Sequence, residues 1–262
     1  MIQYSKKVDE CREVGSLECW CLHGSVGMAA DWRRFTELLS PAGIGSRAVD
    51  LWRFLEGDVL SLTDFGKALN AEALGQVSRG RKRALLGYSM GARMALHALL
   101  ENAHPWYAAV IVSGHPGLKI EQDCARRRAV DVEWASQAMI GSWQNFLYAW
   151  NSQVIFNDNS IRSSEMSDRL ITRRREVARS FVDWSLGKQL SLWPRLAEIS
   201  IPVLWVVGEN DLKFRALAET AVSQMPNAKL AIALGAGHRV PWEKDIWFAE
   251  LVVHFLKNER VD

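Results

Sequence analysis

Residues 87–91, GYSMG, place a serine between two glycines, and Ser89 is the first candidate for chemistry in this sequence. The pentapeptide ends an apolar run at 83–89 and opens a segment whose apolar residues have helical spacing. Glycines at its first and last positions permit a tight strand-to-helix turn that holds the serine hydroxyl above the edge of a sheet. The pattern therefore predicts a nucleophilic or proton-transferring serine, with an ordinary strand-end serine as the alternative.

A serine hydroxyl needs a base, usually a histidine whose ring is oriented by a carboxylate. Of the six histidines, His238 is the best candidate, because it lies in a glycine-rich loop, GAGH, directly after the apolar run at 229–235. Asp211 follows the apolar run at 202–208 and completes the chain order serine, aspartate, histidine, with Glu209 as its rival. Taken singly, Asp211 could cap the next helix and His238 could be a solvated loop residue.

Backbone N–H groups near Ser89 are expected to stabilise an oxyanion that develops during the reaction. Met90 follows the serine directly, so its N–H is the first expected donor. The loop after the apolar run at 17–22 reads HGSVG, and Ser25 within it is the expected second donor, although its glycines could also mark a plain turn. His115, in the loop SGHPG, is a further candidate for the same pocket.

The elements that must position these residues are short apolar runs that alternate with helical patterns. This alternation is typical of parallel strands joined by crossover helices, which predicts an α/β fold with a mostly parallel central sheet flanked by helices. One domain is expected over 1–262, closed by an amphipathic helix at 243–257. Over 117–194 no buried-strand run occurs and the apolar spacing is helical, which predicts a helical lid. The apolar runs lie at 17–22, 46–52, 83–89, 108–114, 202–208 and 229–235.

Composition limits the class of protein. A chain of 262 residues with 48% hydrophobic and 24% charged residues can bury the core of one globular domain. Its net charge of +2 argues against a general polyanion binder, so no nucleic-acid partner is expected. No apolar run approaches the roughly 18 residues of a membrane span, and the N-terminus lacks a signal-like apolar segment. The four cysteines lack metal-ligand spacing, so buried free thiols in a reducing, cytoplasmic setting are expected.

These motifs resemble those of a known family. The serine turn and the order serine, aspartate, histidine resemble the α/β-hydrolases, which implies the α/β-hydrolase fold. A closer resemblance, spanning most of the chain from about residue 17, is to the 2-succinyl-6-hydroxy-2,4-cyclohexadiene-1-carboxylate synthases of menaquinone and phylloquinone biosynthesis. It departs after the second apolar run, where DLWRFLEGDVLSL stands in place of the family's DLPGHGxS. The motifs that carry it are LHG…DW, GYSMGAR, SGHPGL, QVIF, SLGKQ, GENDLKFRALA and AGH.

The resemblance implies a lyase that uses a hydrolase triad for proton abstraction. A base removes a proton beside the succinyl ketone of 2-succinyl-5-enolpyruvyl-6-hydroxy-3-cyclohexene-1-carboxylate, an oxyanion hole holds the enolate oxygen, and pyruvate leaves. Ser89 and His238 match the family positions that transfer the proton, and Asp211 matches the one that orients the histidine. The resemblance implies no metal or other cofactor, so none is expected. Whether menaquinone or phylloquinone is the end product stays open.

A small-molecule substrate with several carboxylates needs cationic partners, and arginine can bind a carboxylate with two parallel hydrogen bonds. Arg93 lies four residues after Ser89, one helical turn on, and is expected near the same pocket. Arg127 and Arg173, in the expected lid, match arginines that the family uses for its carboxylates. The alternatives, should the register slip by one, are Arg126, Arg128 and Arg174.

Two aromatic residues are expected at the ring of the substrate. Tyr88 precedes the serine and Trp150 lies in the expected lid, and both match family positions that line the ring site. Phe156, in QVIF, is a weaker candidate. Because aromatic residues belong to a core more often than to a binding site, packing is the alternative for each of them.

Two other function classes stay open. A carboxylesterase or carbon-carbon bond hydrolase would use the same triad with water, but a neutral ester would gain little from several lid arginines. A non-catalytic binding protein with this fold would not need the complete triad. The sequence contains no heptad pattern or apolar stripe that would indicate an oligomeric state.

Overall fold

The computed structural model describes residues 17–76, 81–156 and 169–258. At the centre of these ranges lies a six-stranded parallel sheet with the strand order β2-β1-β3-β4-β5-β6. Its strands are β1 (Leu17–Leu22), β2 (Ile44–Val49), β3 (Lys82–Tyr88), β4 (Trp106–Val112), β5 (Val203–Gly208) and β6 (Ala228–Ala233). Each predicted apolar run contains most of one strand, so the predicted α/β sheet is confirmed.

The burial of the strands explains why their sequences are apolar. β3, β4 and β5 are buried along almost their whole length, because helices cover both faces of the sheet. The edge strands β2 and β6 are more exposed, and their sequences are less uniformly apolar. Since all six strands run in the same direction, the loops that follow them meet along one edge of the sheet. The predicted catalytic residues all follow strands at this edge.

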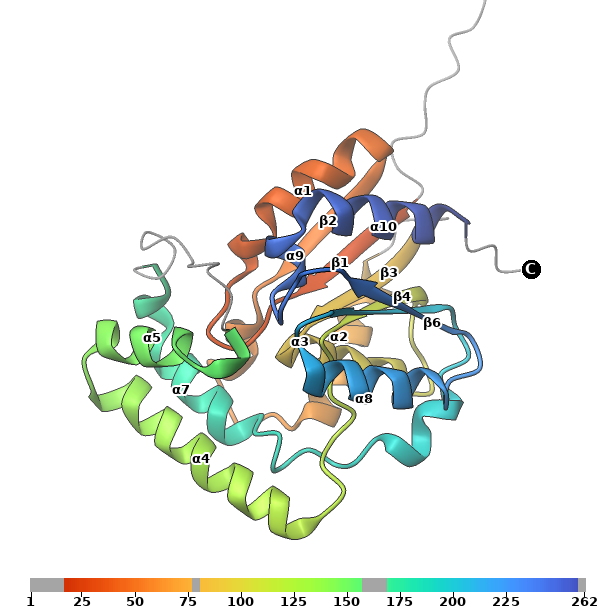
Figure 1. Cartoon of the computed structure of the whole chain (residues 1–262). Coiled ribbons are helices and arrows are strands. Elements are labelled where there is room, and N and C mark those ends of the chain that lie inside the picture. Colours follow the sequence, from red (N-terminus) through yellow and green to blue (C-terminus); the bar gives the residue numbers. More distant parts are fainter. Residues whose placement is uncertain (1–16, 77–80, 157–168, 259–262) are drawn as a thin grey trace, which may run out of the picture.

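Helices cover the two faces of the sheet (Figure 1). On one face, apolar side chains of the flanking helices pack against Leu86 and Val110; on the other face they pack against Leu85 and Ile111. The first face carries α1 (Arg33–Leu39) and α10 (Asp245–Asn258), and the second carries α2 (Leu62–Gly75), α3 (Met90–Leu99) and α8 (Leu212–Val222). The helix predicted at 243–257 is α10, which a separate short helix, α9 (Val240–Glu243), precedes.

Between β4 and β5, the described residues form helices and turns and contain no strand. The helices are α4 (Glu121–Ile140), α5 (Trp143–Asn151) and α7 (Arg174–Asp183). They lie together beside the sheet, with α4 packed along α7 (Figure 1). Trp134 on α4, Phe146 on α5 and Phe181 on α7 join them, with ring centroids 6.2, 6.3 and 6.5 Å apart. These helices lie within the stretch 117–194, for which a lid is predicted.

The cysteines that the structure describes are free and buried, as the sequence predicts. Cys19, Cys21 and Cys124 are free and buried, and Cys11 lies outside the described residues. Burial raises the pKa of the Cys21 thiol, and its hydrogen bond with Cys19 acts in the same direction, so the thiol stays protonated. Within the described ranges, no helix has both the length and the apolar character needed to cross a membrane.

Candidate active site

Ser89 occupies the turn between β3 and α3, with φ of 53° and ψ of −108°. This left-handed φ is uncommon for a residue with a side chain and persists only where the surrounding packing maintains it. Gly91 permits that packing, because a Cβ at this position would collide with the backbone carbonyls of Leu22 and His23. The helix therefore approaches β1 closely, and the turn directs the serine side chain toward the loops at the edge of the sheet.

Ser89, His238 and Asp211 form a continuous chain of hydrogen bonds. The Ser89 Oγ lies 3.1 Å from His238 Nε2, and His238 Nδ1 lies 2.6 Å from Asp211 Oδ2. His238 is 1% exposed and Asp211 is 8% exposed, so both are shielded from water. With Nδ1 protonated and donating to the carboxylate, Nε2 is left to accept the proton of the serine hydroxyl. The arrangement can therefore act as a general base system.

The structure also distinguishes the contacts of Asp211 from those of Glu209, the alternative carboxylate. Asp211 stands at the N-terminus of α8, but its carboxylate contacts the imidazole of His238 instead of capping the helix. Glu209 is engaged elsewhere, since its Oε2 accepts the backbone N–H of Gly235 at 2.8 Å. Of the two carboxylates that follow β5, Asp211 is thus the one that orients the histidine.

Aromatic rings surround the imidazole of His238. The ring centroids of Phe214, Tyr88 and Phe156 lie 4.6, 5.5 and 5.8 Å from that of the imidazole. The Tyr88 ring also packs edge-on against Trp242, with centroids 4.8 Å apart. These contacts limit rotation of the imidazole and keep water from its faces, so the hydrogen bonds to Ser89 and Asp211 are maintained.

The two expected oxyanion-hole residues lie beside the serine. Met90 is the first residue of α3, where N–H groups have no partner within the helix and the helix dipole is positive. Ser25 lies in the loop after β1. Both residues line the same pocket as Ser89 and His238. Backbone donors at this place could stabilise negative charge on a substrate oxygen.

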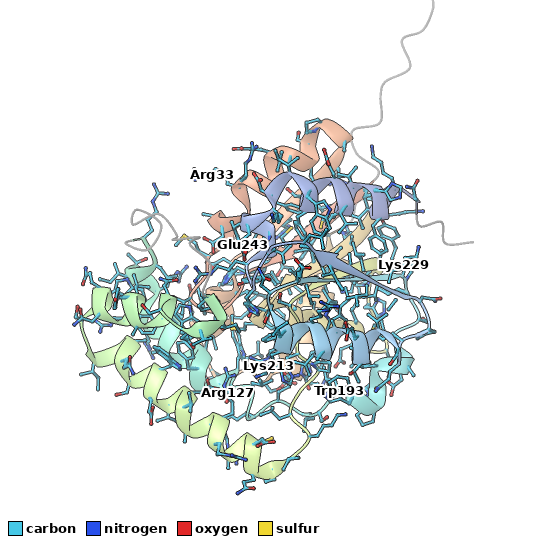
Figure 2. All side chains as sticks on the ribbon, viewed as in Figure 1. Arg33, Arg127, Trp193, Lys213, Lys229 and Glu243 are labelled. Atoms are coloured by element: carbon cyan, nitrogen blue, oxygen red, sulfur yellow. The ribbon has the colours of Figure 1, made fainter. Side chains whose placement is uncertain are left out.

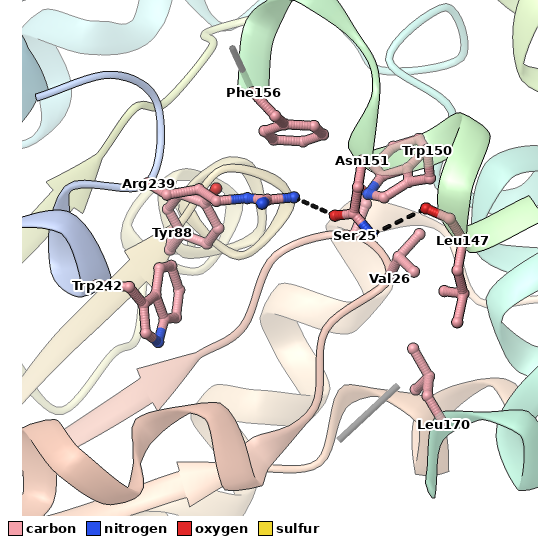
Figure 3. A pocket seen from close by; sticks show the side chains of 10 residues that line it. All are labelled: Ser25, Val26, Tyr88, Leu147, Trp150, Asn151, Phe156, Leu170, Arg239 and Trp242. Atoms are coloured by element: carbon pink, nitrogen blue, oxygen red, sulfur yellow. Dashed lines mark hydrogen bonds between the residues drawn. The ribbon is translucent and has the colours of Figure 1, made fainter. Parts of the chain in front are cut away.

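The pocket in front of Ser89 has a cavity volume of about 110 Å³. Its walls come from the edge of the sheet and from the helices between β4 and β5. The predicted site residues that line it are Ser25, Ser89, Met90, Arg93, Arg127, Trp150 and His238. Asp211 stands behind His238, and Tyr88 lines an adjoining pocket together with Ser25 and Trp150 (Figure 3).

Two of the predicted arginines reach the pocket. Arg93 is 7% exposed, and its Nε donates to Gln189 Oε1 at 2.6 Å. Burial, together with the positive charge of Arg127, lowers the pKa of Arg93 to about 9, so it stays cationic at neutral pH. The Nε of Arg127 donates to Asp131 Oδ1 at 2.8 Å, which holds its guanidinium on the pocket side of α4. Figure 2 places Arg127 and Lys213 between α4 and α8.

Arg173 is not among the residues that line either pocket in the described part of the chain. Its Nη2 donates to Asp50 Oδ2 at 3.1 Å and its Nη1 to Glu56. The hydrogen bond to Glu56 raises the pKa of Arg173, and the charge of Asp50 adds to this. Arg174, its alternative, donates to the backbone carbonyls of Ala138, in the last turn of α4, and of Gly141, which follows α4. The structure therefore ties Arg173 to the segment after β2 and brings neither arginine to the pocket.

Several residues that line the pocket or hold its arginines were not predicted from the sequence. Phe214 follows Asp211 by three positions, within the motif GENDLKFRALA, and no role was predicted for it. Asp131 is four residues after Arg127 on one helix, a spacing that could have suggested the ion pair. Gln189 ends the motif SLGKQ, but no role in the site was predicted for it. His115 does line the pocket, but burial and the charge of Lys213 lower its pKa to about 3, and its Nδ1 accepts the N–H of Gly117, so it is a neutral wall residue.

Comparison with known proteins agrees with this geometry. A family model described as "Alpha/beta hydrolase family" matches residues 21–251, which is most of the chain. The chain belongs to the alpha/beta hydrolase family. This confirms the family resemblance that the motifs indicated. It also explains the strained turn at Ser89, since the alpha/beta hydrolases present their nucleophile at the junction of a strand and a helix.

Individual relatives within the alpha/beta hydrolase family cover nearly the whole chain. A Pectobacterium atrosepticum protein named 2-succinyl-6-hydroxy-2,4-cyclohexadiene-1-carboxylate synthase is 30% identical over 254 residues, covering 94% of this chain and 96% of the relative. A Photorhabdus laumondii protein of the same name is 29% identical, covering 90% and 84%. Among solved structures, MenH from S. aureus has a TM-score of 0.80 at 22% identity, covering 97% and 96%. This structural likeness shows that the fold is shared.

Proposed function

We propose that this protein is a 2-succinyl-6-hydroxy-2,4-cyclohexadiene-1-carboxylate synthase, a lyase that releases pyruvate from 2-succinyl-5-enolpyruvyl-6-hydroxy-3-cyclohexene-1-carboxylate. One observation carries the proposal: the Ser89–His238–Asp211 chain opens onto a pocket whose wall holds two arginines, Arg93 and Arg127. A general base beside two arginines suits the removal of a proton from a substrate that carries several carboxylates. The named relatives, which align over nearly their whole length, support it.

The proposed reaction begins at Ser89. Its Oγ takes the proton from the ring carbon beside the succinyl ketone while its own proton passes to His238 Nε2, and Asp211 stabilises the imidazolium that forms. The electron pair of the broken C–H bond moves through the ring, a ring double bond forms, and the C–O bond to the enolpyruvyl group breaks. The leaving enolate takes up a proton and becomes pyruvate, so water is not consumed.

Charge builds up on the ketone oxygen as the proton leaves. In the proposed site, the N–H groups of Ser25 and Met90 receive this oxygen, helped by the positive end of α3. Because their positions are set by the backbone, they need little rearrangement during the reaction. Such donors typically contribute roughly 100-fold or more to a rate.

Arg93 and Arg127 are proposed to bind substrate carboxylates. Arg93 is pre-positioned by Gln189, and Arg127 by Asp131, whose other oxygen accepts the hydroxyl of Ser185 at 2.7 Å. Guanidinium groups held in this way lose little freedom when a carboxylate arrives. Trp150, which lines the pocket, is proposed to contact the substrate ring, with Tyr88 supporting it from the adjoining pocket.

The helices between β4 and β5 have a place in this proposal. They supply Arg127 and Trp150, so we infer that residues 117–194 form a lid over the edge of a single domain that spans 1–262. A lid of this kind would exclude water from the enolate and its leaving group. The anionic substrate would not cross a bilayer unaided, which favours a cytoplasmic location for the enzyme.

The experiment that tests the function compares two substrates. The purified protein, treated with a chelator, is assayed for pyruvate release and diene absorbance with the cyclohexene substrate, and for ester cleavage with p-nitrophenyl acetate. Pyruvate release with a far lower rate of ester cleavage is the expected result. Ester cleavage without pyruvate release would instead indicate a carboxylesterase that uses the same triad.

A further inference from the structure

A second, smaller pocket adjoins the one in front of Ser89. Its cavity volume is about 20 Å³, against about 110 Å³ for its neighbour. Ser25, Trp150 and Phe156 line both pockets, so the two adjoin beside the expected oxyanion hole. A ligand whose carbonyl oxygen lies at Ser25 could therefore extend into both pockets at once.

The smaller pocket contains an arginine that the mechanism has not used. Arg239 follows His238 directly and is only 6% exposed. Its Nη2 donates to Asn151 Oδ1 at 2.5 Å, and its guanidinium carbon lies 4.0 Å from the ring centroid of Phe156. Figure 3 shows the guanidinium extending beneath the Phe156 ring toward Asn151.

These contacts place the Arg239 guanidinium firmly inside the pocket. Asn151, at the end of α5, is itself fixed because its Nδ2 donates to the carbonyl of Leu147 at 2.8 Å. An amide oxygen is a neutral acceptor, and a carboxylate is a stronger partner for the same guanidinium N–H. An anionic group that entered the pocket would thus gain a better hydrogen bond than the one it displaced.

We propose that Arg239 binds the carboxylate at the end of the substrate's succinyl chain. The inference rests on the proposed function, whose substrate has two carboxylates attached through its ring and one on this chain. With the ketone oxygen at Ser25 and Met90, the ring extends from one side of the carbonyl and the succinyl chain from the other. The larger pocket, with Arg93 and Arg127, matches the ring and its two carboxylates. The smaller pocket, with Arg239, matches the chain and its single carboxylate.

This assignment also supplies a third arginine for a substrate that has three carboxylates. The resemblance assigned this role to Arg173, which the structure instead pairs with Asp50 and Glu56. Arg239 comes from the loop after β6, so it reaches the substrate from the sheet side of the pocket while Arg127 reaches it from the lid. Residues of the sheet and of the lid then bind opposite ends of one molecule, and specificity for the succinyl chain belongs to Arg239.

The test uses 2-succinylbenzoate, a stable aromatic compound with the same chain, and the same compound with its chain carboxylate converted to an amide. Isothermal titration calorimetry gives both dissociation constants. The wild-type protein is expected to bind the acid roughly 10- to 100-fold more tightly than the amide, as for a hydrogen bond between charged groups. Arg239→Gln should bind both compounds alike, and Arg239→Lys should fall between.

Two further variants separate direct binding from a merely structural contact. Asn151→Ala keeps the guanidinium and should still prefer the acid. Arg34→Gln, which changes an exposed arginine on α1 that pairs with Asp245, should behave as wild type. If Arg239→Gln weakens the binding of the acid and of the amide equally, or if Asn151→Ala abolishes the preference for the acid over the amide, the arginine serves to hold α5 and the proposal is wrong.

Turnover distinguishes this proposal from the proposed function. In the pyruvate-release assay, Arg239→Gln should raise KM by roughly 10- to 100-fold and lower kcat much less. Wild-type pyruvate release together with an unchanged acid-to-amide preference in Arg239→Gln would overturn the role of Arg239 alone. A wild-type protein that releases no pyruvate would overturn the function, and with it the identity of this ligand.

Discussion

Replacing Asp211 by asparagine should disable the base while preserving the shape of the site. The carboxylate accepts the Nδ1 proton of His238 at 2.6 Å in a buried position. An asparagine that instead turns its NH₂ group toward Nδ1 would make that nitrogen the acceptor. The ring proton would then lie on Nε2, the nitrogen 3.1 Å from Ser89 Oγ, which could no longer accept the serine proton.

The expected loss of activity in Asp211→Asn is the contribution of general base catalysis. General base catalysis contributes roughly 10²- to 10⁴-fold to a rate, so Asp211→Asn should lower kcat by a factor in that range. This corresponds to about 3 to 5 kcal/mol of transition-state stabilisation. KM should change by less than about threefold, because Asp211 stands behind His238 and the substrate interactions are retained.

The assay follows diene absorbance at several substrate concentrations, with circular dichroism to verify that the variant is folded. Glu209→Gln is the matched control: it changes the neighbouring carboxylate, whose acceptor role toward the N–H of Gly235 a glutamine can keep. Its kcat should stay within about twofold of wild type. The reasoning is refuted if Asp211→Asn retains more than a tenth of wild-type kcat, or if Glu209→Gln loses as much activity.

Three further predictions concern Ser89, Arg127 and stability in acid. Ser89→Ala should lower kcat at least 100-fold with little change in the affinity for 2-succinylbenzoate, measured by calorimetry; full turnover would contradict its role. Arg127→Lys keeps a charge beside Asp131 but loses the planar guanidinium, so KM should rise about tenfold in the diene assay, and an unchanged KM would argue against carboxylate binding. Burial lowers the pKa of His97 to about 4, below its ordinary value near 6.5, so the unfolded chain takes up a proton first as pH falls and stability is lost between these values. The free energy of unfolding, measured by urea denaturation, should therefore depend less steeply on pH between pH 7 and pH 4 in His97→Gln than in wild type, by up to about 1.4 kcal/mol per pH unit. An unchanged slope would show that His97 does not cause the loss of stability in acid.

The sheet and the hydrogen-bonded chain of Ser89, His238 and Asp211 could be predicted because their signals are local. A buried parallel strand reads as a short apolar run, and the candidate site residue comes soon after it, as at Ser89 directly after β3 and Asp211 three residues after β5. Parallel strands bring such positions to one edge whatever the details of the helices. The family's motifs then distinguished Asp211 from Glu209 only by analogy, and the contact with His238 shows which one faces the imidazole.

The binding residues depended on contacts that no local pattern encodes. Arg173 lies in an arginine run whose partners, Asp50 and Glu56, are 123 and 117 positions away in the chain, and the pairing turns its guanidinium away from the pocket. Arg239, beside the predicted histidine, reaches Asn151 across 88 positions. Short-range spacing thus determined which residues follow the strands. Only the packing of α4, α5 and α7 against the rest of the chain decided which arginines face the pockets, because a long side chain goes where a distant partner can compensate the cost of burying its charge.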